Sequence, residues 1–484
     1  SQSMTGTLRD RVNVLGDIVN SSPAYSSESN TVFIGANDGM MHAFNAATGA
    51  ELFAYIPGIV NLTNLKTLAD KAYDHRYFVD GPLAVSAKKL TPNKNILVGS
   101  LGRGGKGLYA LDVTTPATFD GSKALWEVSG SDDDMGFITS RPIITKANNG
   151  STVVIVSNGL NSTNDDPALF IYDLFTGTRL AKLLPIEKGG NDVFDNNGLS
   201  AATGVDQDVD GDVDYMYAGD MKGNVWKFDL SDNNPNNWEV ANNDYPLYSA
   251  KDSTGTITQS ISGGIAIGFD AEFNPWLYFG TGRYLTAGDP STTSVQTWYG
   301  IVDESTNTTI AGRGALKARK IVAAGELDNG SGTGVKVRAF EPQEFPSGVS
   351  DMYGKKGWYI DLVNPPFTAA QKVGERIVGT PVVRGTTVLV SSIIPSEDPC
   401  TVEGSGYVNA VDALTGSSGV YGSESYFDVN GGGFDNDKLV STIDGREISI
   451  GSIDLGIKMP TDALVLAGDT NELVVVGGSI GGTA

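Results

Sequence analysis

Short apolar segments recur along the chain, with the alternating polarity and the turn residues that are typical of β-strands. The clearest copy of the pattern spans Val32 to Gly49. In this copy one strand ends in Gly35, an Asn-Asp-Gly turn follows, and a second strand leads to Thr48-Gly49. The spacing predicts a β-hairpin in each copy, followed by a tight turn.

The pattern occurs about seven times, with drift, and a short apolar strand near a proline or glycine comes before each copy. After the first copy, the others begin near Ile96, Val154, Tyr217, Leu277, Val388 and Leu473. The preceding strands are expected around Pro23, Pro82, Pro142, Ala201 to Val205, Gly263 to Ile267, Pro381 and Pro460. A periodic set of small sheets of this kind closes into a β-propeller, because each sheet buries its faces against its neighbours. We therefore predict an all-β, seven-bladed propeller that occupies residues 1–484 as one domain.

The intervals between copies are uneven, so several blades must carry inserted loops. We expect the largest insertion at about residues 304–373, a range that includes the aromatic pair Trp358-Tyr359. A linker is expected at Glu187 to Gly198, and a short helix at Asn61 to Ala72, where leucines recur at helical spacing.

Composition narrows the choice of partners. The chain carries 34 basic and 57 acidic residues, for a formal net charge of −23, which argues against binding of nucleic acid or anionic lipid. The single Cys400 excludes an internal disulfide, and we find no apolar run of about eighteen residues that could cross a bilayer.

One stretch has a spacing that dictates a chemistry. Carboxylates at loop positions 1, 3, 5 and 9, a glycine at position 6 and a backbone carbonyl at position 7 wrap oxygen ligands around Ca²⁺ in an EF-hand-like loop. The residues in this register are Asp206, Asp208, Asp210 and Asp214 as carboxylates, Gly211 as the turn glycine, and Asp212 as the carbonyl donor. Five carboxylates within nine residues would repel one another without a cation, so we predict calcium as the cofactor.

The loop departs from the full twelve-residue form, because Tyr217 stands where a bidentate Glu would close the coordination shell. Its flanks read as strands, so we expect the loop to lie in a β-hairpin and not between two helices. The alternative reading is a solvated acidic turn. If the loop binds calcium, Asp214→Ala is expected to abolish binding and leave the propeller folded.

Other candidate sites are weaker. His42 and His75, the two histidines of the chain, have no ligand spacing that indicates zinc, and we expect both to be structural. Asp132-Asp133-Asp134 is expected to be a solvated loop, because consecutive residues of an extended chain point to opposite faces. The glycine-rich stretch from Gly102 lacks the following helix that a phosphate-binding loop needs, so it reads as a blade turn.

Beyond the general likeness of the repeat to quinoprotein propellers, several segments together resemble the C-terminal domain of PilY/PilC-type proteins of bacterial type IV pili. The segments are Asn37 to Phe44, Asp210 to Leu230, Phe279 to Leu285, Gly357 to Leu362 and Gly374 to Arg376. The resemblance covers nearly the whole chain, and it maps the family's calcium loop onto Asp206 to Asp214.

This resemblance implies an exported protein of the periplasm or outer membrane, the cell surface and the pilus tip. The family supports pilus assembly, counters retraction, and contributes to adhesion and twitching motility. Its expected partners are minor or major pilins, the assembly machinery and a host-cell surface receptor. We expect this chain to be the C-terminal part of a larger exported protein. It has no Arg-Gly-Asp tripeptide, which puts adhesion through that motif in doubt.

Two other functions share parts of the pattern. A quinone-dependent dehydrogenase would resemble its relatives in using adjacent cysteines and a calcium ion in the central channel, whereas Cys400 is alone and the acidic loop is confined to one hairpin. A calcium-stapled propeller that binds a carbohydrate or a receptor would fit the loop, although such loops then recur in several blades. Trp276, Trp298 and Trp358 read as core residues. We predict that the chain is not an enzyme.

Overall fold

The computed structural model describes residues 8, 9, 11, 13–185, 197–396, 404–466 and 472–479. Cys400 and residues 187–196 of the expected linker lie outside this range. The backbone divides into two compact units, of which the first comprises Ser1–Ala218 with Lys227–Tyr245 and the second Gly219–Trp226 with Pro246–Ala484. Each unit is described by itself.

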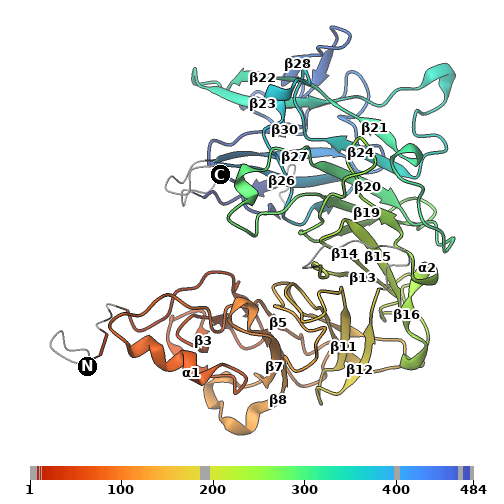
Figure 1. The fold of residues 1–484 in the computed structure, drawn as a ribbon. Helices are drawn as coiled ribbons and strands as arrows, with labels where there is room; N and C mark the ends of the chain where they lie inside the picture. Colours follow the sequence, from red (N-terminus) through yellow and green to blue (C-terminus); the bar gives the residue numbers. More distant parts are fainter. Residues whose placement is uncertain are drawn as a thin grey trace. The chain divides into compact units, whose positions relative to one another are not determined.

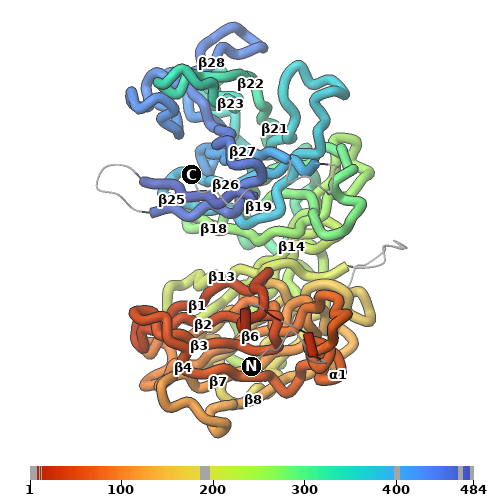
Figure 2. Tube along the Cα trace, turned by 90° about the vertical axis from the view of Figure 1, so that its left-hand side faces the viewer, coloured from red at the N-terminus to blue at the C-terminus, as the bar shows by residue number. Residues whose placement is uncertain are grey.

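The first unit contains three antiparallel sheets of four strands, each built from consecutive segments of the chain (Figure 1). Figure 2 shows the four strands of the first sheet side by side in chain order. The strands are β1 (Ala24–Ser26), β2 (Thr31–Gly35), β3 (Met41–Asn45) and β4 (Glu51–Tyr55); β5 (Leu83–Val85), β6 (Ile96–Ser100), β7 (Gly107–Asp112) and β8 (Ala124–Ser129); and β9 (Ile143–Lys146), β10 (Thr152–Ser157), β11 (Leu169–Asp173) and β12 (Arg179–Leu183).

A further hairpin of the first unit pairs β13 (Thr203–Val205) with β14 (Tyr215–Gly219). The last residues of β15 (Asn224–Asp229) pair with β16 (Glu239–Val240). Helical turns are short: α1 (Leu62–Leu65) runs into the 3-10 helix η1 (Lys66–Ala69), and α2 is Ala241–Asp244. The other 3-10 turns of this unit are η2 (Gly102–Gly104), η3 (Pro116–Thr118), η4 (Gly121–Lys123) and η5 (Pro235–Asn237). The helix expected at 61–72 is therefore helical only over residues 62–69.

The second unit is also built from sheets. Its strands are β17 (Tyr248–Ser249), which pairs with the first residues of β15; β18 (Ala266–Phe269), β19 (Pro275–Gly280), β20 (Thr297–Val302), β24 (Gly357–Asp361) and β21 (Lys317–Arg319) in one sheet; and β22 (Ile321–Asp328), β23 (Gly334–Phe340), β30 (Ser452–Ile453), β27 (Gly404–Asp412), β26 (Thr387–Pro395) and β25 (Val382–Arg384) in another. Two-stranded sheets pair β28 (Lys438–Val440) with β29 (Glu447–Ser449), and β31 (Leu464–Leu466) with β32 (Leu473–Val475). The 3-10 turns are η6 (Asp289–Ser291), η7 (Arg313–Ala315), η8 (Pro346–Gly348) and η9 (Ala369–Gln371).

These strands confirm the all-β reading, and the strands of each repeat copy lie where the hydrophobic pattern places them. Among the described residues, six sheets have four or more strands, so the count of seven blades stays a prediction. The range expected as the largest insertion, about 304–373, contains β21, β22 and β23. It also contains β24, which pairs with β20 as a regular strand of its sheet.

Alternate residues of one strand belong to two different cores. On β6, Ile96 and Val98 join a cluster with β10 and β11, whereas Leu97 joins a cluster with β2 and β3. Strand β7 divides in the same way, with Leu108 on one side and Tyr109 on the other. Because successive side chains point to opposite faces, the continuous apolar run of a central strand means that the sheet is covered on both faces. This is the packing that a radial stack of sheets requires.

The turn that closes each repeat copy has a defined structure. The Asp173 carboxylate accepts hydrogen bonds from the backbone N–H groups of Phe175 and Thr176, at 3.1 and 2.8 Å. Gly177 follows with a φ of +68°, which a residue with a side chain adopts only at a cost. The second of these contacts recurs at Asp412, where the N–H of Thr415 donates to the carboxylate at 2.9 Å and Gly416 follows with a φ of +67°.

A tryptophan of the preceding sheet covers this turn. In the first unit the Trp126 indole donates a hydrogen bond to the Leu174 carbonyl at 2.8 Å and lies against Gly177. In the second unit Trp358 donates to the Ala413 carbonyl at 2.7 Å and lies against Gly416. In both cases the accepting carbonyl follows the turn aspartate directly. The repeat therefore carries a contact that fixes one sheet onto the next.

A second recurring turn explains the position of His42. Asp220 and Asp270 each hold the asparagine four residues ahead and the tryptophan six residues ahead through one carboxylate oxygen. In the first copy Asp38 meets His42 at the asparagine position, with Nε2 at 3.1 Å from Oδ2, and Nδ1 of His42 lies 2.6 Å from Glu51. His42 is buried, so it is part of the hairpin structure, as expected.

A buried ion pair lies where β23, β27 and β30 meet, an association of strands that the sequence pattern did not predict. The guanidinium of Arg338 on β23 donates to both carboxylate oxygens of Glu375, at 2.7 and 2.9 Å. It also donates to Asn409 on β27 at 2.7 Å and to Ser452 on β30 at 3.0 Å. Arg338 is fully buried. A buried guanidinium needs all of these acceptors. The network therefore specifies that the β22–β23 hairpin joins the sheet that contains β27 and β30.

The turn glycines provide a matched test of the tryptophan contact. Gly49 and Gly177 have nearly the same φ, +71° and +68°, but a Cβ on Gly177 would lie 2.6 Å from Trp126 whereas a Cβ on Gly49 meets nothing within 4 Å. Gly49→Ala is expected to lower the free energy of unfolding by about 1–2 kcal/mol, the cost of the left-handed backbone alone. Gly177→Ala adds overpacking of about 1–3 kcal/mol. Equal losses for the two variants in urea unfolding would show that the tryptophan does not cover the turn.

Stability should depend on pH through His42. Burial works to lower the pKa of His42, but the hydrogen bonds and charges of Asp38 and Glu51 outweigh it and raise that pKa. A raised pKa in the folded state means that the stabilisation is fully present below the ordinary histidine value of about 6.5 and is lost as the pH rises through the folded value.

We therefore expect His42→Gln to lower the free energy of unfolding most in mildly acidic buffer, and the difference from the parent to shrink as the pH rises above about 6.5. Urea unfolding at a series of pH values measures this difference. The exposed His75, changed to Gln, is the control for loss of a histidine. A His42→Gln effect that grows with pH would contradict the assignment.

Candidate metal centre

The acidic loop connects two paired strands of the first unit. Strand β13 ends at Val205 and β14 begins at Tyr215, and the two strands pair in antiparallel register. The N–H of Asp214 donates to the Val205 carbonyl at 2.9 Å, which closes the base of the loop. The loop thus lies within a β-hairpin, as the spacing of its flanking strands predicts.

Three of the predicted carboxylates converge. Ligand oxygens of Asp206, Asp208 and Asp210 all lie within 4.8 Å of one another. Backbone N–H groups hold the Asp206 side chain in place, since Asp210 donates to its Oδ1 at 3.1 Å and Gly211 donates to its Oδ2 at 2.8 Å. The loop is folded so that its carboxylates face one point, which suits a hard cation such as Ca²⁺.

The backbone of the loop takes conformations that side chains disfavour. Gly211 has a φ of +101°, and an added Cβ there would meet nothing within 4 Å. The backbone conformation, and not a lack of space, therefore requires glycine at this position. Val209 has a φ of +62°, which for a β-branched residue is a true outlier. Its side chain is largely exposed, so packing does not compensate for this strain.

The electrostatics of the loop favour a bound cation. Loss of surrounding water, followed by repulsion from Asp210, Asp214 and Asp206, raises the pKa of Asp208. Desolvation and then the charge of Asp210 raise the pKa of Asp212 as well, although Lys146 opposes this. Carboxylates that raise one another's pKa in this way are stabilised when a cation neutralises them.

Asp214 differs from the other four residues. Its side chain is buried, and its oxygens accept hydrogen bonds from the Gln207 N–H at 2.7 Å and from the Asn148 amide at 3.1 Å. It lies outside the group of three converging carboxylates. Asp214 therefore braces the hairpin, and the Asp214→Ala substitution expected to leave the fold intact would also remove these bonds. Its role as a calcium ligand stays a prediction.

Sequence reasoning missed Asn148, which follows β9. Its side-chain amide donates to the Val213 carbonyl at 3.0 Å and to the Leu230 carbonyl at 3.2 Å, in addition to Asp214. The N–H of Val213 donates to the Lys146 carbonyl, so the end of β9 is tied to the acidic loop. The Asn-Asn-Gly sequence at 148–150 indicates a turn. Local spacing does not reveal that Asn148 of this turn binds residues of the next sheet.

The weaker candidates have structural roles in the described chain. Asp132 and Asp134 pair with Lys182, at 3.1 and 2.6 Å, and Asp134 is buried, so the expectation of a solvated loop is wrong for Asp134. The glycine-rich stretch after β6 is a turn, with η2 at its start. The three tryptophans read as core residues are all buried: Trp276, Trp298 and Trp358.

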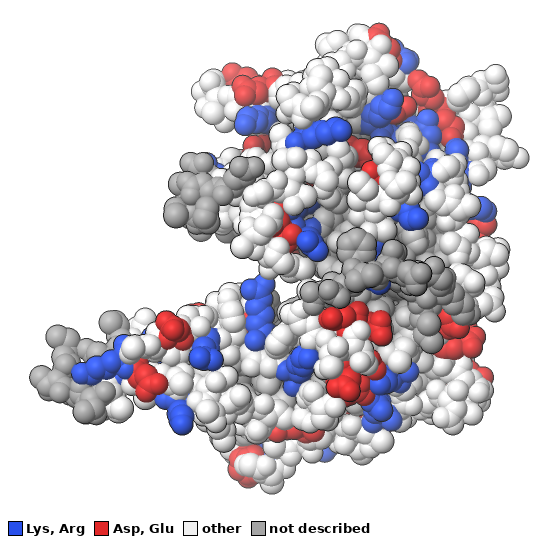
Figure 3. Space-filling model, in the orientation of Figure 1, with Lys and Arg blue, Asp and Glu red and all other residues white. Residues whose placement is uncertain are grey.

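Charged side chains of both signs lie on the surface. On the face that Figure 3 shows, acidic and basic side chains lie interspersed. Among the described residues, no helix has both the length and the apolar character that a bilayer-spanning helix needs.

Comparisons with known proteins agree with the fold. A model of the PilY1 β-propeller domain matches residues 6–329. A type IV pilus biogenesis factor PilY1 homolog of Xylella fastidiosa is 38% identical over 406 residues, which cover 81% of this chain and 26% of that protein. The type IV pilus biogenesis factor PilY1 of Pseudomonas aeruginosa strain PAK is 32% identical over 474 residues, which cover 86% of this chain and 40% of that protein.

A solved structure extends the match. The crystal structure of the Pseudomonas aeruginosa PilY1 C-terminal domain superposes with a TM-score of 0.71 at 27% identity, and the match covers 94% of this chain and 91% of that one. The chain spans between about a quarter and two-fifths of the length of the two curated relatives. The sheets of the described residues thus form an all-β propeller, and the chain belongs to the PilY1 family of type IV pilus biogenesis factors.

Proposed function

We propose that this chain is a calcium-binding β-propeller that acts in the biogenesis of type IV pili. The observation that carries the proposal is the convergence of Asp206, Asp208 and Asp210 in a hairpin loop whose Gly211 has a positive φ. The relatives, named as pilus biogenesis factors, supply the pilus context.

Calcium would be held by the carboxylates of Asp206, Asp208 and Asp210 and by the Asp212 carbonyl, with Asp214 as the fifth protein ligand of the predicted set. Bound Ca²⁺ supplies positive charge that relieves the repulsion between these side chains. The loop lacks the bidentate Glu of the full form, so we propose a dissociation constant on the order of micromolar, weaker than in tight calcium buffers. Mg²⁺ should bind less well, because it demands an octahedron that this loop does not preform.

Occupancy by calcium would fix the hairpin in one geometry. The loop connects β13 and β14. The amide of Asn148, in the turn after β9, donates to the Val213 carbonyl and to the Asp214 carboxylate at the end of the loop. Through these bonds the ion would act on two neighbouring sheets of the first unit. We propose that this state is the one recognised by pilins and by the assembly machinery.

At the level of the whole protein, we propose an exported factor of the periplasm, outer membrane and cell surface that reaches the pilus tip. It would support fibre assembly, counter retraction, and contribute to adhesion and twitching. A host-cell surface receptor is a further partner under this proposal. The support is the family membership of the chain together with the segments in which it resembles that family.

Calcium binding is best tested at Asp208, which is exposed and whose side chain accepts a single hydrogen bond within the described part of the chain, from the Asp210 N–H at 3.3 Å. Asp208→Asn keeps the size of the side chain and removes one negative charge. We expect calcium affinity in titration calorimetry to fall about tenfold or more, which corresponds to about 1.4 kcal/mol. Asp435→Asn, an exposed aspartate outside the loop, is the matched control and should bind like the parent. Equal affinity of parent and Asp208→Asn would reject the site.

Calcium should also stabilise the parent protein. A ligand that binds only the folded state at one hundred times its dissociation constant adds about 2.7 kcal/mol to the free energy of unfolding. We expect a gain of this order for the parent and for Asp435→Asn, and a much smaller gain for Asp208→Asn at the same calcium concentration. Denaturant unfolding with calcium or with a chelator measures these gains.

The pilus role is tested separately, in cells that carry Asp208→Asn in the full-length protein. We expect altered fibre display or twitching, with Asp435→Asn cells resembling the parent. Normal piliation and twitching at every calcium level, combined with lost calcium binding in vitro, would reject the regulatory role and leave the metal site standing.

We further propose that the chain is not an enzyme. Its relatives are named as biogenesis factors, and the acidic loop is confined to one hairpin. We expect no dye-linked oxidation of simple alcohols or sugars in the presence of pyrroloquinoline quinone and calcium. Turnover of about one per second or more, in the range of ordinary enzymes, would overturn this expectation.

A further inference from the structure

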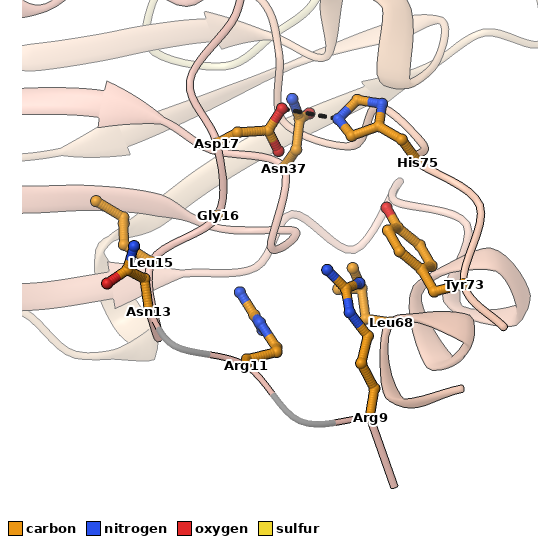
Figure 4. A pocket seen from close by; sticks show the side chains of 10 residues that line it. All are labelled: Arg9, Arg11, Asn13, Leu15, Gly16, Asp17, Asn37, Leu68, Tyr73 and His75. Carbon is orange, nitrogen blue, oxygen red and sulfur yellow. Dashed lines mark hydrogen bonds and ion pairs between the residues drawn. The ribbon is translucent and has the colours of Figure 1, made fainter. Parts of the chain in front are cut away.

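A polar pocket lies in the first unit, away from the calcium loop. It has a volume of about 390 Å³ and is lined by residues of the N-terminal segment, the β2–β3 turn, η1 and the segment after η1. Figure 4 shows Arg9 and Arg11 on one side of this pocket, and Asn37 beside the Asp17–His75 pair on the other. A pocket of this size holds a small organic molecule or the last residues of a peptide.

Two buried hydrogen-bond donors of the pocket have no acceptor among the described residues. Asn37 is 2% exposed, and its Nδ2 has no partner, whereas its Oδ1 accepts from the Phe78 N–H at 3.0 Å. Nη1 of Arg9 is also buried and has no hydrogen-bond partner. Buried donors without acceptors are costly and rare in native proteins, so both groups point to a ligand that brings oxygen atoms.

The two arginines are held in place for such a ligand. The Arg9 guanidinium stacks on the Tyr73 ring, with Cζ 4.3 Å from the ring centroid. The backbone N–H of Arg9 donates to the Ala69 carbonyl at 2.8 Å. Arg11 donates through Nη2 to the Val14 carbonyl at 2.8 Å. A stacked guanidinium presents a rigid planar fork that matches a carboxylate.

The charges around the pocket favour an anionic ligand. Besides the two arginines, the ionisable groups that line it are Tyr73 and the Asp17–His75 pair, which is joined through Oδ2 and Nε2 at 2.7 Å. Leu15 and Leu68 line the pocket as well, and they offer apolar contact to the body of an organic ligand.

We propose that this pocket binds a carboxylate, with its charged oxygens at Arg9 and a second acceptor atom of the ligand at the Asn37 amide. The C-terminus of a peptide and a small organic acid both carry this chemistry. The inference rests on the pocket alone and does not depend on the proposed calcium site.

The test uses the whole chain and titration calorimetry with N-acetyl-alanyl-alanine as the probe. The matched probe is the same dipeptide with a C-terminal amide, which lacks the charge. We expect the acid to bind and the amide to bind at least about tenfold more weakly, the loss typical of a charged hydrogen-bonded pair. No binding of the acid at millimolar concentration, or equal binding of acid and amide, would overturn the proposal.

Two variants locate the binding. Asn37→Asp keeps the oxygen that accepts from Phe78 and replaces only the unpartnered donor, and Arg9→Gln removes the stacked charge. Each should weaken the acid at least about tenfold. Arg141→Gln, an exposed arginine outside the pocket, should not. Thermal unfolding checks that each variant is folded. Unchanged binding in both folded pocket variants, or an equal loss in Arg141→Gln, would place the binding elsewhere and reject the site.

Two further probes separate the sources of the carboxylate. Tighter binding of the dipeptide acid than of propionate would assign the pocket to peptide C-termini, whereas equal binding would assign it to small organic acids. Inorganic phosphate is the third probe. If it competes as well as the dipeptide acid does, the pocket is a general anion site and the carboxylate assignment fails.

Discussion

The packing of each sheet between two neighbours is the constraint on which the rest of this structure depends. A strand such as β6 sends Leu97 into one core and Val98 into the next, so its register cannot shift by one residue without exchanging the two cores. Trp126 and Trp358 connect one sheet to the next within this packing, because each donates a hydrogen bond to the turn that closes the following sheet. Loops that depart from the sheets can therefore vary while the sheets stay in register.

The acidic loop and the pocket beside the N-terminal segment both use this freedom. The acidic loop replaces an ordinary hairpin turn between β13 and β14, and Asn148 fastens it to the β9 turn of the preceding sheet. The pocket forms where the N-terminal segment crosses the β2–β3 turn, with Asn37 held through its oxygen by Phe78. In both places a rigid strand end positions polar groups that the sheet itself does not need.

Much of the fold was predictable because its signals are local. Alternating apolar runs, Thr-Gly turns and the Asp-rich spacing each lie within about twenty residues, and the structure places a strand at each predicted copy. What could not be predicted depends on partners distant in sequence. The β22–β23 hairpin reads as an insertion, yet Arg338 binds Glu375, Asn409 and Ser452, and the hairpin is part of the sheet that contains β27 and β30. Likewise, the spacing assigns Asp214 to the metal, but only the fold shows that Asn148 and Gln207 bind its oxygens.

The most direct measurement is a crystal structure of this chain grown with terbium, a calcium mimic whose anomalous scattering identifies its position without assumptions about ligands. We expect one strong anomalous peak between the carboxylates of Asp206, Asp208 and Asp210, with the Asp212 carbonyl in contact. A loop without a peak, or a peak at Asp132 to Asp134 in its place, would contradict the assignment of the hairpin as the metal centre.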